Sequence, residues 1–466
     1  MAVSYFFEHC HYLITFFLLI HITFVNLLEN KTKDTFYLTR FILQYFLFIC
    51  SSLLLIFFFK IFFLHNSFYI NNFCLNFSTS IFSDTLICLA LIVTIVSWVY
   101  LSERFLFKTS FFIFYFFIFI IFTINLVYTS NLLIMFINFE FIFLPSLFFV
   151  YKFGYAKKVI KTINFLLTWT LTGSFVVLIT LLLLYSVANS LDLNVLSRVM
   201  FTSTEKTFFF FLFFLGFGVK IPIWPFHYWL TKVHVEAPAG FSIFLSGFLV
   251  KTAFYCYSFF FYLFNSYYLN LIALTIILWG TYDASVRMWG AFDIKRLIAF
   301  ATIQEMNLMM ILLILLNNYY MSILNVFLLF HGCLSALLFF LIDQIQKRTH
   351  TRNLTSIGGL YTLYPQLCTF IWISLLIFRG FPVFIKFFIE WELLHVLIIN
   401  FKTFGIFFFL LCAAFGVLGF CRIFFSLMFG QPGNLFLTTD LLSRDLVTCI
   451  FLVFFLFFLN FFFIFF

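Results

Sequence analysis

Long apolar runs, interrupted by short polar stretches, follow one another along almost the whole sequence. A helix needs about 20 mostly apolar residues to cross the hydrocarbon core of a bilayer. Because the runs are continuous rather than alternating segments of about ten residues, they exclude a transmembrane β-barrel. The sequence therefore predicts an all-α polytopic membrane protein. About fourteen runs meet the length requirement, and their approximate limits are 12–28, 41–64, 81–101, 109–128, 129–150, 162–187, 208–231, 239–263, 267–283, 293–316, 319–342, 366–400, 403–428 and 446–466.

The composition excludes a soluble domain. Of the 466 residues, 65% are hydrophobic and 9% are charged, whereas about a quarter of the residues of an ordinary soluble domain are charged. Phe accounts for 86 positions, a bias typical of strongly A/T-rich coding, which points to an organelle or symbiont genome. The start, Met1 to His11, lacks the patterns of a signal or transit peptide. We therefore expect the chain to be made next to its membrane.

The sequence contains no motif for a redox cofactor, a metal or nucleic acid. The ten Cys residues are scattered through apolar runs with no C-x-x-C pair, which argues against an iron–sulfur, zinc or disulfide framework. Gly216 and Gly218 begin like a dinucleotide fingerprint, but Ile221 stands where the third Gly would be. A nucleic-acid interface would need a clustered basic face. We therefore expect no cofactor in this chain and no nucleic-acid partner.

The distribution of basic residues predicts the orientation in the membrane. Lys and Arg accumulate in loops on the side where a membrane protein is synthesised. Of the 26 basic residues, seventeen, among them Lys295, lie in loops after odd-numbered runs, and four lie in loops after even-numbered runs. We therefore expect both termini on the outer side of the membrane.

The remaining basic residues and several acids fall well inside the predicted spans. A charge at the bilayer centre costs roughly 2.5–3.5 kcal/mol on insertion scales, so retained charges mark functional sites unless they reach the interface. Glu140, Lys220 and Lys251 have apolar neighbours on both sides, which favours the functional interpretation. Glu305 and Glu390 also lie deep. For four others, a functional role and a position at a span end stay equally open: Arg379, Lys386, Glu392 and Arg422.

Two predicted spans are broken by proline next to an ionisable residue. Pro222 and Pro225 follow Lys220 in the seventh span, and Pro382 follows Arg379 in the twelfth. A broken helix at membrane depth is tolerated only where it faces protein or water. The two breaks therefore predict sites inside the protein near the midplane.

The spacing of these residues predicts an internal repeat. Glu140 precedes Lys220 by 80 residues, and Glu305 precedes Glu390 by 85. Two units of five helices share this spacing of charged residues, and an odd number of helices per unit forces the second unit to be inverted in the membrane. The predicted parts are divergent helices 1–3 at 1–108, a first half-channel at 109–263, a second at 264–430, and a C-terminal helix at 431–466.

Two stretches around the first break resemble a known family. Residues 217–230, Phe-Gly-Val-Lys-Ile-Pro-Ile-Trp-Pro-Phe-His-Tyr-Trp-Leu, and residues 233–240, Val-His-Val-Glu-Ala-Pro-Ala-Gly, closely resemble the signature of the NADH dehydrogenase subunit 4 family. These are antiporter-like proton-pumping subunits of respiratory complex I. The resemblance covers about residues 130–430. It is supported by Glu140 with Pro145, by Gly173-Ser174, by Asp293 to Ala299 and by His331-Gly332.

The resemblance implies the site residues and the surroundings of the chain. Glu140, Lys220, Lys251, His331 and Glu390 match the proton-relay positions of the family. It implies partners among the other membrane-arm subunits of complex I, especially neighbouring antiporter-like subunits, together with membrane lipids, in the mitochondrial inner membrane with both termini on the intermembrane-space side. NADH, FMN, iron–sulfur clusters and ubiquinone are expected in other subunits.

The sequence departs from the family pattern in the second half. Glu305 stands where the family typically has His, and Lys386 and Ile389 replace small or amide residues before Glu390. The role of the usual His is therefore open: either Glu305 takes over as a proton relay, or water alone bridges that part of the channel.

The expected mechanism is a proton switch. A buried ammonium group keeps its proton beside a carboxylate and releases it when the carboxylate moves away. Glu140 would control Lys220 in this way, and the proton would pass through Lys251 and His331 to Glu390. Two alternatives stay open: a subunit of a multi-subunit cation/proton antiporter, and a membrane scaffold that has lost transport.

Overall fold

The computed structural model describes residues 81–104, 109–154, 159–265, 267–315, 321–430 and 439–464. The first two predicted spans, 12–28 and 41–64, lie outside the described residues. Within the described ranges the chain is helical, and the only strand-like features are two isolated β-bridges. The all-α prediction is confirmed.

The described helices correspond to predicted spans 3–14. Eight helical stretches are long and apolar enough to cross a membrane, and three shorter apolar helices accompany them in the part that the structure describes. The main helices are α3 (Ile81–Arg104), α4 (Thr109–Tyr128), α5 (Leu132–Phe153), α6 (Val159–Ala188), α8 (Ser203–Lys220), α9 (Tyr228–Glu236), α10 (Ala239–Phe244), α11 (Val250–Phe264), α12 (Tyr267–Gly290), α13 (Ile294–Leu315), α14 (Met321–Thr349), α16 (Pro365–Phe378), α17 (Ile385–Met428) and α18 (Ser443–Ile464). Short helices α7 (Leu193–Leu196) and α15 (Leu360–Leu363) lie between them.

Helix α17 contains the predicted boundary between spans 12 and 13. Lys402 has a non-helical backbone with φ 52° and ψ −128°. A Cβ atom added at Gly405 would lie 2.5 Å from the carbonyl oxygen of Leu397, eight residues earlier, although these residues would be about 12 Å apart in a straight helix. The chain therefore folds back at Lys402, and the absence of a Cβ at Gly405 allows the close approach.

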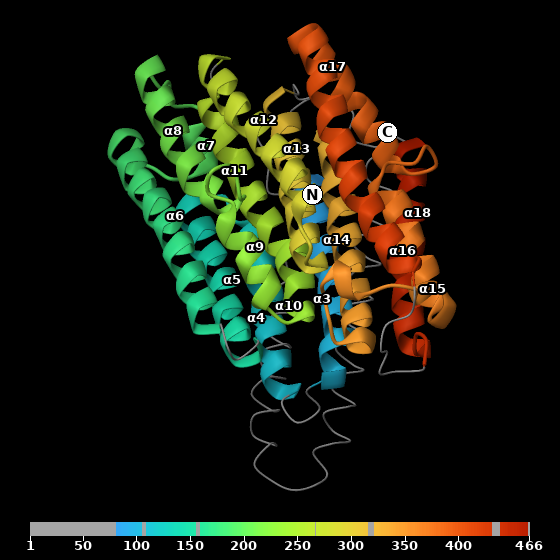
Figure 1. Cartoon of the computed structure of the whole chain (residues 1–466). Helices are drawn as coiled ribbons and strands as arrows, with labels where there is room; N and C mark the ends of the chain where they lie inside the picture. Colours follow the sequence, from blue (N-terminus) through green and yellow to red (C-terminus); the bar gives the residue numbers. More distant parts are fainter. Residues whose placement is uncertain are drawn as a thin grey trace, which may run out of the picture.

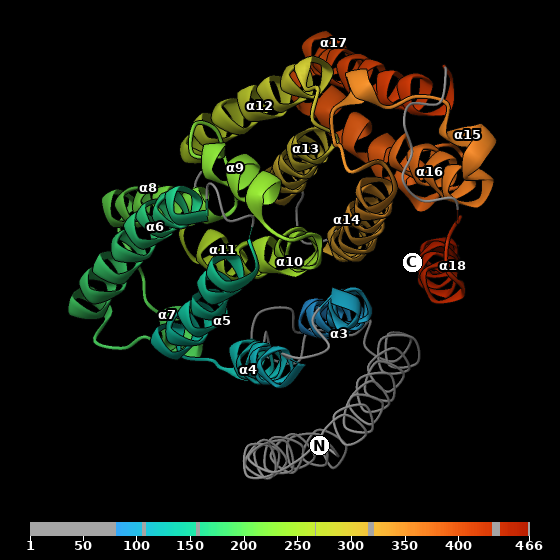
Figure 2. The same ribbon diagram turned by 60° about the horizontal axis from the view of Figure 1, so that its bottom comes forward.

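Helix α14 lies in the middle of the second half of the bundle, where it packs against α3, α10, α13, α16 and α18 (Figures 1 and 2). The apolar windows of α13 and of the stretch from α10 to α11 are entirely buried. In contrast, much of α6 and α17 is exposed, as expected for helices that face lipid or neighbouring subunits. The central helices α11, α13 and α14 are the ones that carry Lys251, Glu305 and His331.

The two isolated β-bridges support the predicted inverted repeat. Asn131, which caps α5, pairs with Asp192, and Asp293, directly before α13, pairs with Asn353. In each case the bridge joins the start of one helix to the chain that follows the next. The sequence predicts five membrane crossings between the two helix starts, which would put the bridges on opposite sides of the membrane. The limits of the units at 109–263 and 264–430 remain a prediction.

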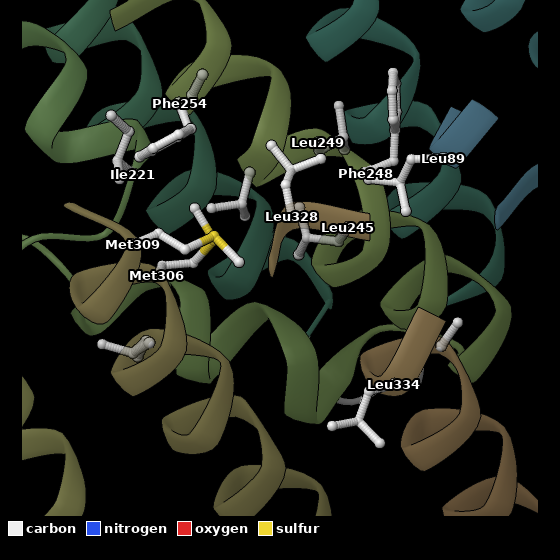
Figure 3. Close-up of a cluster of buried hydrophobic side chains, with 14 of the residues drawn as sticks. Leu89, Ile221, Leu245, Phe248, Leu249, Phe254, Met306, Met309, Leu328 and Leu334 are labelled. Atoms are coloured by element: carbon white, nitrogen blue, oxygen red, sulfur yellow. The ribbon is translucent and has the colours of Figure 1, made fainter. Parts of the chain in front are cut away.

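Apolar side chains fill the space between the central helices. Figure 3 shows Leu245 and Leu249, from the stretch between α10 and α11, grouped with Leu328 of α14, and Met306 and Met309 of α13 near the end of α8. The ionisable groups in the centre of the bundle are thus surrounded mostly by apolar side chains, so they depend on one another for stabilisation.

Candidate functional site

The first break separates α8 from α9 and leaves its free backbone groups satisfied. α8 ends at Lys220, two residues before Pro222. The indole Nε1–H of Trp229 donates a 2.7 Å hydrogen bond to the carbonyl of Val219, and the amide of Ile223 donates to the carbonyl of Gly218. A helix end inside a membrane is costly unless such partners exist. The broken helix is thus a stable element that holds Lys220 in place.

Lys220 forms a buried ion pair with Glu140, as its position in the sequence led us to expect. Its Nζ atom donates a hydrogen bond to Oε1 of Glu140 on α5. The Lys220 side chain is 1% exposed and the Glu140 side chain 27%. The ammonium group also lies 4.2 Å from the ring centroid of Phe139. It stands at the C-terminal end of α8, where the helix dipole stabilises a cation.

Lys251 lies fully buried at the start of α11, directly after a π-helical turn at Leu245–Leu249. Its Nζ atom donates to the carbonyl of Ser246 within this turn. A π-turn interrupts the regular α-helical hydrogen-bond ladder and is frequent at functional sites. The ammonium group has no carboxylate within ion-pair distance in the described structure, although it interacts electrostatically with Glu305.

His331 lies on α14 of the second half, the helix that packs against both α10 and α13. Its side chain is buried, and its Nδ1 atom has no hydrogen-bond partner among the described residues. The imidazole interacts electrostatically with both Lys251 and Lys386. Gly332 packs closely on Gly247, since an added Cβ would lie 3.1 Å from the Gly247 carbonyl. This contact brings the π-turn that precedes Lys251 against α14.

The second break separates α16 from α17 and holds a second cluster of charges. Lys386 donates a 2.6 Å hydrogen bond to Oε1 of Glu305 and another to the carbonyl of Phe378, the last residue of α16. Oε1 of Glu390, one helical turn further on, lies 3.5 Å from the same Nζ atom. Gly380 has φ +63°, and an added Cβ would lie 2.7 Å from Oε2 of Glu390. The break therefore needs glycine at this position.

The structure thus brings the six predicted site residues into two charged clusters and a middle section. Glu140 and Lys220 form the first cluster, and Glu305 and Glu390 meet in the second. Lys251 and His331 lie in the middle section, and no hydrogen bond joins Lys220 to Lys251.

Lys386 is the residue whose importance the sequence did not resolve. Its side chain is 2% exposed, so it is not a span-end residue. By contact, Lys386 rather than Glu390 is the counterpart of Lys220, because the ammonium group of each lysine lies at the C-terminal end of the first half of a broken helix. Lys220 is itself the last residue of α8, whereas Lys386 belongs to the first turn of α17 and reaches the carbonyl of Phe378 at the end of α16. The signal in the sequence was its spacing of four residues from Glu390, which places both side chains on one helix face.

The other ionisable residues have mainly structural surroundings. Arg379 lies over the rings of Phe378 and Phe420, and Arg422 donates to the carbonyl of Ala291. Glu392 is partly exposed. The prediction that Lys295 lies in a loop was wrong: it is buried in the first turn of α13, where it donates to the carbonyl of Ala237.

The sequence also gave no indication of a contact between His227 and Asp283. Nε2 of His227 lies 3.4 Å from Oδ2 of Asp283, which also accepts from Arg287. Among the described residues no group of three or more His, Cys, Asp or Glu side chains could hold a metal ion.

The family comparison agrees with the motifs. Residues 129–416 match the family described as NADH:quinone oxidoreductase/Mrp antiporter, TM. The NADH-ubiquinone oxidoreductase chain 4 of Paramecium tetraurelia is 35% identical over 314 residues, which are 66% of this chain and 64% of the relative. The chain therefore spans less than two thirds of the length of the curated relatives that it matches.

Two solved structures share the fold. A chain of the Mrp complex from Dietzia sp. DQ12-45-1b is similar with a TM-score of 0.76 and 16% identity, covering 91% of this chain and 81% of that chain. A chain of respiratory complex I from Thermus thermophilus with bound NADH is similar with a TM-score of 0.72 and 19% identity, covering 81% of this chain and 80% of that chain. At such identities the likeness concerns the fold alone.

Proposed function

The chain belongs to the NADH:quinone oxidoreductase/Mrp antiporter family of transmembrane proteins, and from this premise we propose that it is a proton-translocating membrane-arm subunit of NADH:ubiquinone oxidoreductase. The observation that carries the proposal is the buried pair of Lys220 and Glu140 at a broken helix. The curated relatives named NADH-ubiquinone oxidoreductase chain 4 support the subunit 4 assignment.

The pair can act as a proton switch. While Glu140 accepts a hydrogen bond from Lys220, the ammonium form is stabilised; when Glu140 turns away, the buried group favours loss of its proton. Lys251, His331 and Glu390 then provide acceptors further along the bundle. Moving one proton against 100 mV requires roughly 2.3 kcal/mol, and breaking a buried pair changes the energy by about 3–5 kcal/mol. The switch is of the required size, but quinone reduction in other subunits supplies the energy.

The proposal includes the surroundings of the chain. We infer that the exposed faces of α6 and α17 contact lipids and neighbouring antiporter-like subunits of the membrane arm. The location would be the mitochondrial inner membrane, with the chain organelle-encoded and both termini on the intermembrane-space side. NADH, FMN, iron–sulfur clusters and ubiquinone would be bound by other subunits of the same complex.

The second candidate is a subunit of a multi-subunit cation/proton antiporter. The similarity of the fold to a chain of the Mrp complex favours it. Both candidates use the pair of Glu140 and Lys220, and they differ in the source of energy, which would be an ion gradient in the antiporter.

A native gel of the isolated membranes distinguishes the two candidates. Intact complexes would be separated, stained for NADH-oxidising activity and analysed by mass spectrometry. We expect this chain to migrate with an activity that is sensitive to quinone-site inhibitors. Migration with a complex that lacks this activity would contradict the proposal and support the antiporter.

A further inference from the structure

The second break contains a lysine that neither the family motif nor the first cluster accounts for. We propose that Lys386 is a second proton-carrying residue, which receives a proton from Glu305 and passes it to Glu390. The inference rests on the proposed function, because it concerns the route of the same protons through the second half of the chain.

The hydrogen bonds of Lys386 are those of a charged ammonium group held between two acids. Its three N–H bonds have three acceptors: Oε1 of Glu305 at 2.6 Å, the carbonyl of Phe378, and Oε1 of Glu390 at 3.5 Å. The carbonyl keeps the nitrogen in place whichever carboxylate is protonated. One nitrogen thus touches an acid on α13 and an acid on α17, so a proton can pass from helix to helix with only small side-chain movements.

The second cluster repeats the chemistry of the first. Each ammonium group is buried at the negative end of a helix, that of Lys220 at the end of its own helix α8 and that of Lys386 at the end of the preceding helix α16. Each also lies over a phenyl ring, at 4.2 Å for Phe139 and 3.9 Å for Phe378. Each also has a partly exposed carboxylate partner, 27% for Glu140 and 28% for Glu390. These shared features indicate that Lys386 can work as Lys220 does.

Glu305 supplies the connection to the middle of the bundle. Its side chain is 3% exposed, Oε1 is bound by Lys386, and Oε2 is buried without a hydrogen-bond partner. Lys251 and His331 interact electrostatically with this cluster, Lys251 through Glu305 and His331 through Lys386. An unpaired buried oxygen is costly, and here it offers a position for a proton that arrives from Lys251 or His331. Arg379 is the other cation near Glu305 and Glu390.

The transfer steps balance without any further reactant. A proton leaves Nζ of Lys386 for the Glu390 carboxylate, so one N–H bond breaks and one O–H bond forms. The neutral amine then takes a proton from Glu305, which an arriving proton had neutralised at Oε2 before the transfer, so one O–H bond breaks, one N–H bond forms and Glu305 returns to the carboxylate form. Glu390 then releases its proton, which restores the starting state. Between transfers, two carboxylates face two cations, Lys386 and Arg379, so the cluster has no net charge.

Replacement of Lys386 by Arg tests proton transfer separately from structure. Arginine keeps the charge and the donors, but it does not release its proton in proteins. The intact complex would be placed in vesicles, and the number of protons moved per NADH oxidised would be measured. We expect Lys386→Arg to lower this yield by the same fraction as Lys220→Arg. The matched control is Lys295→Arg, a buried lysine on α13 that donates to a backbone carbonyl, and it should keep the yield.

The results separate this inference from the proposed function. If Lys220→Arg lowers the yield and Lys386→Arg does not, Lys386 is structural and the inference is overturned, whereas the proposed function stands. If neither lowers it, both are overturned. If Lys386→Arg does not assemble, the double variant Glu305→Gln with Lys386→Met removes one charge of each sign. We expect that variant to assemble with the reduced yield, and a normal yield would overturn the inference.

Discussion

Removing the charge of Glu140 should separate the structural and the transport roles of the first ion pair. In Glu140→Gln the ammonium group of Lys220, 1% exposed, loses its only carboxylate partner in the described structure. Loss of one partner from a buried pair costs about 3–5 kcal/mol, and an unpaired charge at the bilayer centre costs roughly 2.5–3.5 kcal/mol. The ring of Phe139 offsets about 0.5–2 kcal/mol. A net loss of about 2–3 kcal/mol corresponds to a change of roughly thirty- to two-hundred-fold in the equilibrium for assembly.

The double variant Glu140→Gln with Lys220→Met is the decisive comparison. It removes both charges, and replacing a buried pair by apolar groups is often neutral or stabilising. We expect the double variant to recover stability, measured as retention of this chain in the complex on native gels after heating. We expect neither variant to pump normally, measured as NADH-driven acidification of vesicles. Equal stability of the single and double variants would refute the energetic reasoning, and normal pumping by the double variant would refute the switch.

Three further predictions concern the breaks and one helix start. Gly380→Ala should lower the proton yield, because the left-handed backbone costs roughly 1–2 kcal/mol for other residues and the new Cβ displaces Glu390. The control is Gly290→Ala, since an added Cβ at Gly290 has nothing within 4 Å. An unchanged yield in Gly380→Ala would contradict the assigned position of Glu390. Trp229→Phe leaves a buried carbonyl unpaired and should destabilise the chain by about 1–3 kcal/mol in thermal assays; a variant as stable as the original would show that the bond is dispensable. The Thr202 amide holds the pKa of Glu205 below its usual value. Because the folded-state pKa is the lower one, this capping contribution is present above about pH 4.3 and is lost as the pH falls through the folded value. Amide exchange rates at the start of α8, divided by the intrinsic rate at each pH, should therefore rise in acid, and they should not do so in Glu205→Gln.

The helices were predictable from the apolar runs, but their ends outside the membrane were not. Span 109–128 coincides with α4. Helix α14 continues to Thr349, seven residues past the predicted limit of 342. The prediction ended too early because the last turns of the helix are polar and the apolar run stops before them. There Arg348 donates to the carbonyls of Gln344 and Asp440, which stabilises the helix without apolar contacts. Hydropathy reports the membrane boundary of such a helix and not its end.

The first ion pair of the site was predictable from the sequence, because Glu140 and Lys220 match the family pattern. The contact between Glu305 and Lys386, two residues that differ from the family pattern, was not predictable. Glu140 and Lys220 were paired from their depth and from the resemblance, and the structure places them in contact. Glu305 and Lys386 were each recognised as unusual, but their contact depends on the rotation of α13 about its axis. No spacing between residues 81 positions apart determines that rotation. The i,i+4 relation of Lys386 to Glu390 was the one local signal.

The close packing of Gly247 on Gly332 limits how the centre of the bundle can move. An added Cβ at Gly332 would lie 3.1 Å from the Gly247 carbonyl and 2.2 Å from Leu89 of α3, so three elements interlock at this point. Packed interfaces of this kind have discrete arrangements and do not deform continuously. Sliding of α14 past the π-turn would therefore require all three elements to separate. In the proposed route, proton movement between Lys251 and His331 would therefore depend on torsional changes of single side chains, while the helix crossing between them stays rigid.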